Sequence, residues 1–196
     1  MRALIIFIKN PALGKVKTRL AQDVGDEKAL AIYNDLLAYT KNVSQKTLAD
    51  KVFVFHSPTL IDHNLWKGNI FVNRVQVKGD LGAKMSAAIN QVILAGYQEV
   101  CLIGSDCFEI TEHHINKAFE GLAENDVVIG PAKDGGYYLL GQQKLHDQIF
   151  DKMPWSKPNL LNKTQMVLIV NGINYKLLEV LSDVDYIEDL PKDYQF

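Results

Sequence analysis

The sequence contains little cysteine, no long apolar run and almost no net charge, and the first two absences exclude whole classes of protein. Two cysteines, Cys101 and Cys107, cannot build a disulfide framework or a four-ligand zinc site. Leu4–Ile8 is among the longest apolar runs, far below the roughly 18 to 20 residues that a membrane span needs. No signal-peptide pattern is visible, so we expect a cytoplasmic protein without a membrane span.

What is present is typical of a globular chain. Of 196 residues, 47% are hydrophobic and 22% are charged, which excludes a disordered tail, a collagen and a coiled coil. At roughly 150 residues per domain, the length predicts one domain over residues 1–196.

The net charge of −2 conceals two opposite ends. The first 20 residues carry five basic and no acidic side chains, and residues 179–196 carry six acidic side chains against Lys192. These ends are either two solvated surfaces or the two halves of one charged site.

Strand and helix patterns alternate along the chain, which predicts an α/β fold with a mostly parallel sheet. Strands are expected at residues 3–8, 51–55, 70–77, 99–104, 126–130, 137–141 and 175–178. Helices are expected at 26–42, 79–95, 111–122 and 159–170, with a short one after Asp185. In such a sheet, ligands bind beyond the carboxyl ends of the strands, so the loops there are the candidates for function.

The loop after the first strand is basic and reads KNPALGKVKTRL over residues 9–20. Lys15, Lys17 and Arg19 alternate and can converge on one anion, and Arg19 can bind a phosphate through two nitrogens. Gly14 permits a tight turn or a close approach of a ligand. Neither GxxxxGK[ST] nor GxGxxG occurs here, which argues against a Walker loop and an NAD site. The alternative is a basic surface loop.

Three acidic loops complete the candidates. Asp106 follows the fourth strand, where it either holds a divalent metal or caps a turn. Asp134 lies in an Asp-Gly-Gly turn between two apolar strands, which is either a plain hairpin or a carboxylate loop over a pocket. Asp183 and Asp185 lie on the same side of an extended segment. They either bind a hard cation or are simply two acidic residues before a helix, where they favour its dipole.

These motifs occur in the order found in one family. They are FIKNP at 7–11, GKVKTRL at 14–20, GDLG at 79–82, GSDC at 104–107, GPAKDGGYYLLG at 130–141, WS at 155–156 and DVD at 183–185. Together they resemble the bacterial GT-A-type nucleotide-diphospho-sugar transferases, some of which are called radical-SAM/selenodomain-associated transferases. The chain is similar more distantly to the molybdenum-cofactor and phospholactate guanylyltransferases. The resemblance runs from residue 3 to about residue 190.

The resemblance implies a three-layer αβα sandwich of the GT-A, Rossmann-like type that binds a nucleotide. It implies Mg²⁺ or Mn²⁺ held by Asp106 and Asp185, catalytic roles for Lys17 and Arg19 on the phosphates, and Asp134 on the acceptor or sugar side. The nucleotide-binding residues that it implies are Lys9, Gly14, Lys15, Lys17, Arg19, Gln76, Gly79, Asp80, Leu81, Gly82 and Lys84.

The chain departs from the family pattern at three places. Lys84 stands where an arginine is usual. The lysine keeps the positive charge but lacks the planar guanidinium group that can bind two oxygens at once. Phe108 stands where a proline is usual, and Tyr186 where a threonine is commoner. The family pattern therefore does not predict the geometry of these two loops.

The leading hypothesis is therefore a metal-dependent transferase, most simply a glycosyltransferase that uses an NDP-sugar and an unknown acceptor. One alternative is a nucleotidyltransferase that joins an NTP to a phosphorylated acceptor and releases pyrophosphate; another is a nucleotide-binding module without turnover. A nucleic-acid partner is not expected, because the basic cluster is short and lacks interleaved aromatics. The oligomeric state is open.

Overall fold

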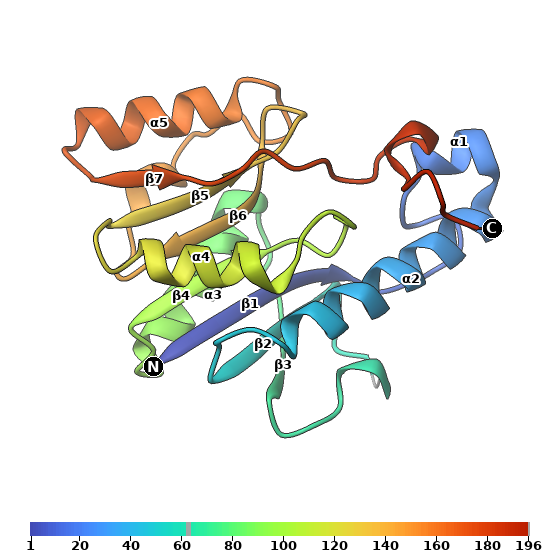
Figure 1. The fold of residues 1–196 in the computed structure, drawn as a ribbon, viewed down its shortest axis with the longest axis horizontal. Helices are drawn as coiled ribbons and strands as arrows, with labels where there is room; N and C mark the ends of the chain where they lie inside the picture. Colours follow the sequence, from blue (N-terminus) through green and yellow to red (C-terminus); the bar gives the residue numbers. More distant parts are fainter. Residues whose placement is uncertain (62–63, 196) are drawn as a thin grey trace.

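The computed structural model describes residues 1–61 and 64–195, and its centre is one seven-stranded sheet (Figure 1). The strands are β1 Arg2–Lys9, β2 Lys51–Ser57, β3 Phe71–Val75, β4 Glu99–Ile103, β5 Val127–Pro131, β6 Tyr137–Gln142 and β7 Tyr175–Leu177. Their order in the sheet is β3-β2-β1-β4-β6-β5-β7. Among the seven strands that the structure describes, only β6 runs antiparallel to its neighbours, so the mostly parallel sheet is confirmed.

Helices cover both faces of the sheet because β1 is apolar on both sides. Leu4 and Ile6 pack in one buried cluster with side chains of α2 and α4, while Ala3 and Ile5 pack in another with side chains of α3 and α5. These helices are α2 Asp26–Ser44, α3 Leu81–Leu94, α4 Glu112–Gly121 and α5 Leu160–Val170. The result is the expected three-layer αβα sandwich.

The helix ends follow the capping rules. Asp80 caps α3 by accepting the Ala83 N–H at 2.8 Å, and Gly96 follows the helix with a φ of +97° that glycine tolerates. Thr111 precedes α4, as expected, and its N–H donates to Nδ1 of His114 at 3.1 Å.

The short helix expected after Asp185 is a 3₁₀ turn over Ile187–Asp189. Other short elements were not expected: a one-turn helix, α1 Leu20–Val24, precedes α2, and 3₁₀ turns span Asn64–Trp66 and Asp147–Ile149. Elements this short carry too few residues to show a helical period in the sequence.

The strand order reverses beside β1. The β1–α2–β2 connection extends the sheet to one side of β1, and α3 returns the chain to β4 on the other side. Ile6 lies opposite Ile103, so the loops after β1 and β4 leave from the same edge. A reversal of this kind opens a crevice at the carboxyl edge of a sheet.

The acidic tail returns along this edge. After β7, the Leu181 N–H donates to the Pro131 carbonyl at 3.1 Å, and the Val184 N–H donates to the Asp106 carbonyl at 2.8 Å. The tail then packs beside α1, where Val184 and Leu20 are fully buried in one cluster (Figure 1). The fold therefore brings the acidic tail to the basic loop.

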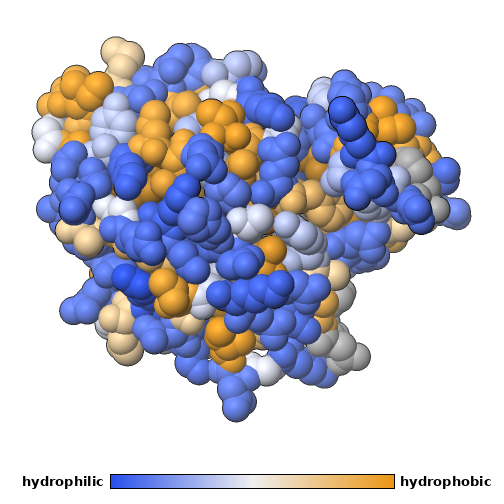
Figure 2. All heavy atoms as spheres, in the orientation of Figure 1, coloured by the Kyte–Doolittle hydropathy of each residue, from blue (hydrophilic) through white to orange (hydrophobic). Residues whose placement is uncertain are grey.

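The visible face of the molecule is largely hydrophilic (Figure 2). Apolar side chains gather over the corner at α5, where Met166, Ile169 and Val170 are exposed. Within the described part of the chain, no helix combines the length and apolarity that crossing a membrane requires.

Candidate functional site

A cleft of about 580 Å³ opens at the carboxyl edge of the sheet. Ten of the residues singled out from the sequence line it, namely Lys9, Lys17, Arg19, Gln76, Leu81, Lys84, Asp106, Asp134, Asp183 and Asp185. Segments from both ends and from the middle of the chain thus meet at one site.

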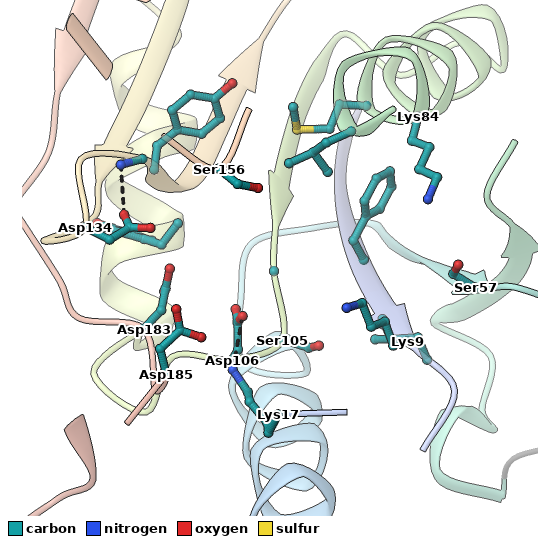
Figure 3. Close-up of a pocket in the computed structure, with 18 of the residues that line it drawn as sticks. Lys9, Lys17, Ser57, Lys84, Ser105, Asp106, Asp134, Ser156, Asp183 and Asp185 are labelled. Atoms are coloured by element: carbon teal, nitrogen blue, oxygen red, sulfur yellow. Dashed lines mark hydrogen bonds and ion pairs between the residues drawn. The ribbon is translucent and has the colours of Figure 1, made fainter. Parts of the chain in front are cut away.

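The two sides of the cleft carry opposite charge (Figure 3). Asp134, Asp183 and Asp185 lie on one side, and Lys9 and Lys84 lie on the other. The acidic side comes from the β5–β6 turn and the C-terminal segment, and the basic side comes from the end of β1 and from α3.

Asp106 and Lys17 lie between the two sides and form an ion pair (Figure 3). Nζ of Lys17 lies 3.3 Å from Oδ2 of Asp106, and the Lys17 side chain is only 7% exposed. Lys17 has a φ of +46°, an uncommon left-handed conformation for a lysine. Asp106 thus pairs with Lys17 inside the cleft, and the cap position before α4 belongs to Thr111.

A second ion pair joins the basic loop to the C-terminal segment at the rim. Nη1 of Arg19 lies 2.8 Å from Oδ2 of Asp185, and the Arg19 side chain is 58% exposed. The Asp185 N–H donates to Oδ2 of Asp189 at 2.9 Å, which holds the backbone of this acidic segment.

Asp183, which the family resemblance gave no role of its own, also lines the cleft. Its Oδ1 is buried and has no hydrogen-bond partner in the part of the chain that the structure describes. Burial, followed by the charges of Asp106 and Asp134, raises the pKa of Asp183 to about 8. The signal in the sequence was the Asp-Val-Asp spacing, in which the buried Val184 leaves both flanking carboxylates on the cleft side.

Asp134 lies in a hairpin and in the cleft wall at once, so both interpretations of its turn hold. Strands β5 and β6 pair antiparallel across the turn, and Oδ1 of Asp134 accepts the Gly136 N–H at 2.8 Å. Gly135 has a φ of +89°, and a β-carbon there would collide with the Pro158 carbonyl oxygen. This close contact seats the turn against the segment that brings Ser156 into the cleft.

Two polar side chains tie the basic side to the sheet. The Tyr33 hydroxyl, on α2, accepts the Lys9 N–H and donates to the Lys9 carbonyl, both at 2.9 Å; burial raises its pKa to about 12. The Gln76 amide donates to the carbonyls of Ile8 and Phe55 at 3.1 and 2.9 Å. Tyr33 lies in the helix expected at residues 26–42, and no local sequence signal marks it for the cleft.

Five residues that the resemblance implied for nucleotide binding do not line the cleft, namely Gly14, Lys15, Gly79, Asp80 and Gly82. Lys15 is exposed, and the other four shape the segments that line the cleft. Gly14 and Gly79 take positive φ angles, and a β-carbon on Gly82 would lie 2.5 Å from the Trp155 ring. Trp155 therefore packs behind the start of α3, and its neighbour Ser156 lines the cleft.

The carboxylates of Asp106, Asp183 and Asp185 fit a hard divalent cation, because carboxylate oxygens are the ligands that Mg²⁺ and Mn²⁺ prefer. The unsatisfied, buried Oδ1 of Asp183 supports this fit. Across residues 1–61 and 64–195, however, no three acidic, histidine or cysteine side chains gather into a ready-made metal site. A cation here needs ligands from elsewhere, as Mg²⁺ commonly takes from substrate phosphates and water.

The fold is that of the nucleotide-diphospho-sugar transferases. A provisionally assigned nucleotide-diphospho-sugar transferase from Desulfovibrio desulfuricans G20 is 30% identical, with a TM-score of 0.88 over 94% of this chain and 82% of that one. CMP:2-keto-3-deoxy-manno-octonic acid synthetase in complex with CTP is 11% identical, with a TM-score of 0.57 over 94% and 93% of the chains. Rv0371c of Mycobacterium tuberculosis H37Rv in complex with manganese is 15% identical, with a TM-score of 0.54 over 96% and 94%.

The chain belongs to the family DUF2064, described as an uncharacterized protein conserved in bacteria, whose model matches residues 28–157. No curated protein matches the sequence. The identity to the Desulfovibrio protein places the two chains in the same family.

Proposed function

We propose that this protein is a metal-dependent transferase that acts on a nucleotide substrate, and that it moves a glycosyl group from an NDP-sugar to an acceptor. The observation that carries the proposal is the charge-divided cleft, in which cations from the β1 loop face carboxylates from β4 and the C-terminal segment. A nucleotide diphosphate bound with a divalent cation matches this division, because phosphate suits the basic side and the cation suits the acidic side.

Lys17 and Arg19 are the groups that we assign to the phosphates. Lys17 is largely buried, where a charge is less screened than in water, and Arg19 offers a planar fork to two phosphate oxygens. Negative charge grows on the leaving phosphate as the glycosyl bond breaks, and fixed cations stabilise that charge.

Asp106 and Asp185 are the carboxylates that we assign to Mg²⁺ or Mn²⁺. The bound cation would supply charge stabilisation for the leaving diphosphate. Asp134 lies across the cleft from the lysines, and we assign it to the acceptor or sugar side. One of its oxygens is held by the Gly136 N–H, which orients the carboxylate.

Nucleotidyl transfer is the second candidate reaction, and it uses the same residues. It is supported by the likeness in fold to the octonic acid synthetase, which was crystallised with CTP. Glycosyl transfer takes precedence because the relative at 30% identity is assigned to NDP-sugar transfer.

A thermal-shift panel tests the nucleotide site. The panel contains the four NTPs, the four NDPs and common NDP-sugars, each with Mn²⁺ and with EDTA. We expect at least one nucleotide to raise the melting temperature in Mn²⁺, because a ligand that binds only the folded state stabilises it, and we expect EDTA to remove most of that shift. No shift with any nucleotide in Mn²⁺ would contradict the proposal.

The nucleotide that binds then separates the reactions. With a radiolabelled NDP-sugar, glycosyl transfer releases NDP and leaves the label on the acceptor, or, in slow transfer to water, on the free sugar. With a radiolabelled NTP and phosphorylated acceptors, nucleotidyl transfer releases pyrophosphate. Release of neither product, from a protein that binds the nucleotide, would favour a binding module without turnover.

A further inference from the structure

The two cations proposed for phosphate binding pair with the two carboxylates proposed for metal binding. Nζ of Lys17 lies 3.3 Å from Asp106, and Nη1 of Arg19 lies 2.8 Å from Asp185. Each pair uses a carboxylate oxygen that a divalent cation would also use. The basic loop and the metal therefore compete for the same groups.

The pairing is built into the fold by packing behind it. The Lys17 carbonyl accepts the Ala21 N–H at the start of α1. Leu20, on that helix, is fully buried in one cluster with Val184, the residue between the two acids of the tail. The cluster thus holds the basic loop and the acidic segment side by side.

From these contacts we propose that Lys17 and Arg19 act as internal competitors for the divalent cation, so that the site accepts metal and nucleotide together and accepts metal alone poorly. The inference rests on the proposed function. A cation already within hydrogen-bonding distance of a carboxylate weakens the attraction of that carboxylate for a second cation. Phosphate groups attract Lys17 and Arg19 and thereby free the carboxylates.

The coupling between metal and nucleotide must be reciprocal. If the nucleotide raises the affinity for the metal by some factor, the metal raises the affinity for the nucleotide by the same factor. Part of that factor comes from direct metal–phosphate contact. The competition adds a second part, which disappears when the competing cation is removed.

The proposal predicts two effects of opposite sign from one substitution. Removing Arg19 or Lys17 weakens nucleotide binding but strengthens the binding of Mn²⁺ offered alone. Damage to the fold would weaken both, so a gain in metal affinity is a specific signature. We expect Arg19→Gln to bind Mn²⁺ roughly two- to fivefold more tightly, since its pair is exposed, and Lys17→Met about tenfold, since its pair is better shielded.

The test is an electron paramagnetic resonance titration of free Mn²⁺ with the full-length protein, repeated with the nucleotide that gives the largest thermal shift. Lys84→Met is the matched control, because Lys84 lines the same cleft and forms no ion pair with any described carboxylate. It loses the same charge, and we expect weaker nucleotide binding with less than a twofold change in affinity for Mn²⁺ alone. Arg19→Gln alters an exposed side chain, so its result does not depend on whether Lys17→Met folds.

The outcomes separate the inference from the function. Tighter Mn²⁺ binding by Arg19→Gln, with no such gain in Lys84→Met, supports the competition. Unchanged or weaker Mn²⁺ binding by Arg19→Gln and Lys17→Met, in a protein that still binds nucleotide with Mn²⁺, overturns the competition and leaves the proposed function standing. An equal gain in all three variants also overturns it, because it would reflect net charge alone. Wild-type protein that binds neither Mn²⁺ nor nucleotide overturns both.

Discussion

The two edges of the sheet use charge in different ways. At the amino edge, Arg2 pairs with Glu99 at 2.7 Å, and the N-terminal ammonium group donates to the Gln98 side chain at 3.3 Å. At the carboxyl edge, Asp106, Asp134, Asp183 and Asp185 line one cleft, and within the described part of the chain ion pairs reach two of them, Asp106 and Asp185. The amino edge pairs its opposite charges directly, whereas the carboxyl edge holds carboxylates without an ion pair among the described residues.

This contrast separates stability from function within one fold. The amino edge satisfies its charges locally, as a structural edge does. The carboxyl edge keeps a buried carboxylate oxygen unsatisfied and raises the pKa of Asp183. A carboxyl group whose ionised form is disfavoured by burial is typical of functional sites, where a ligand supplies the missing partner.

The largest effect is expected from neutralising the carboxylate between the two walls. Asp106→Asn keeps the shape of the side chain but removes a charge that the proposed metal requires. We expect turnover, as kcat/KM, to fall by about 10²- to 10³-fold, measured with the substrate that the nucleotide panel identifies. Glu99→Gln removes a carboxylate at the opposite edge and serves as the control, with little change expected. Comparable losses in both variants would mean that Asp106 acts only through the fold.

The next effect concerns Asp183 and changes with pH. Its pKa is raised from an ordinary value near 4 to about 8 in the folded protein. Ionisation therefore costs stability, and the cost grows as the pH rises from about 4 to about 8. Asn resembles the neutral acid, so Asp183→Asn is expected to match wild type near pH 4.5 and to be more stable by about 1–3 kcal/mol at pH 8.5.

Urea unfolding at both pH values measures this difference. Asp151→Asn, at an exposed position, controls for the loss of one negative charge. If Asp183→Asn destabilises the protein at pH 8.5, the carboxylate contributes favourable contacts and its burial without an ion pair is not a cost. A stabilised variant with weaker binding of Mn²⁺ and nucleotide would show that stability is given up for binding.

The fold was predictable from the sequence wherever the apolar residues of a segment showed the spacing of a strand or a helix. Leu4–Ile8 predicted a strand covered on both faces, and the packing of its alternate residues in two clusters confirms this. The helix after Thr111 was marked by its cap. By contrast, α1 buries Leu20 in a cluster with Ile32 and Leu36 of α2 and with Val184, which lies 164 positions away. No local pattern in its five residues reports these contacts.

The site was predictable in its residue types and less so in its pairings. Strand-end loops with Lys17, Asp106 and Asp134 were expected to meet, because a parallel sheet gathers its carboxyl ends. That Lys17 pairs with Asp106 and Arg19 with Asp185 depends on the path of the C-terminal segment, which the sequence does not encode locally. Phe108 shows the same limit, since it replaces a usual proline and packs with its ring centroid 5.5 Å from Tyr39 and 5.7 Å from Tyr194.

The smallest effect is expected at the amino edge, from Arg2→Gln. The Arg2 side chain is 32% exposed, pairs with Glu99 and lies 5.6 Å from the centre of the Phe119 ring. A partly exposed ion pair contributes about 0.2–1 kcal/mol, so the free energy of unfolding in urea should fall by no more than about 1 kcal/mol. Glutamine keeps part of the aliphatic side chain that covers Phe119. Because Arg2 lies at the opposite edge of the sheet from the cleft, we expect the affinities for Mn²⁺ and nucleotide to stay unchanged. A change in either affinity would show that the two edges are coupled through the sheet, because no charge at the amino edge reaches the cleft directly.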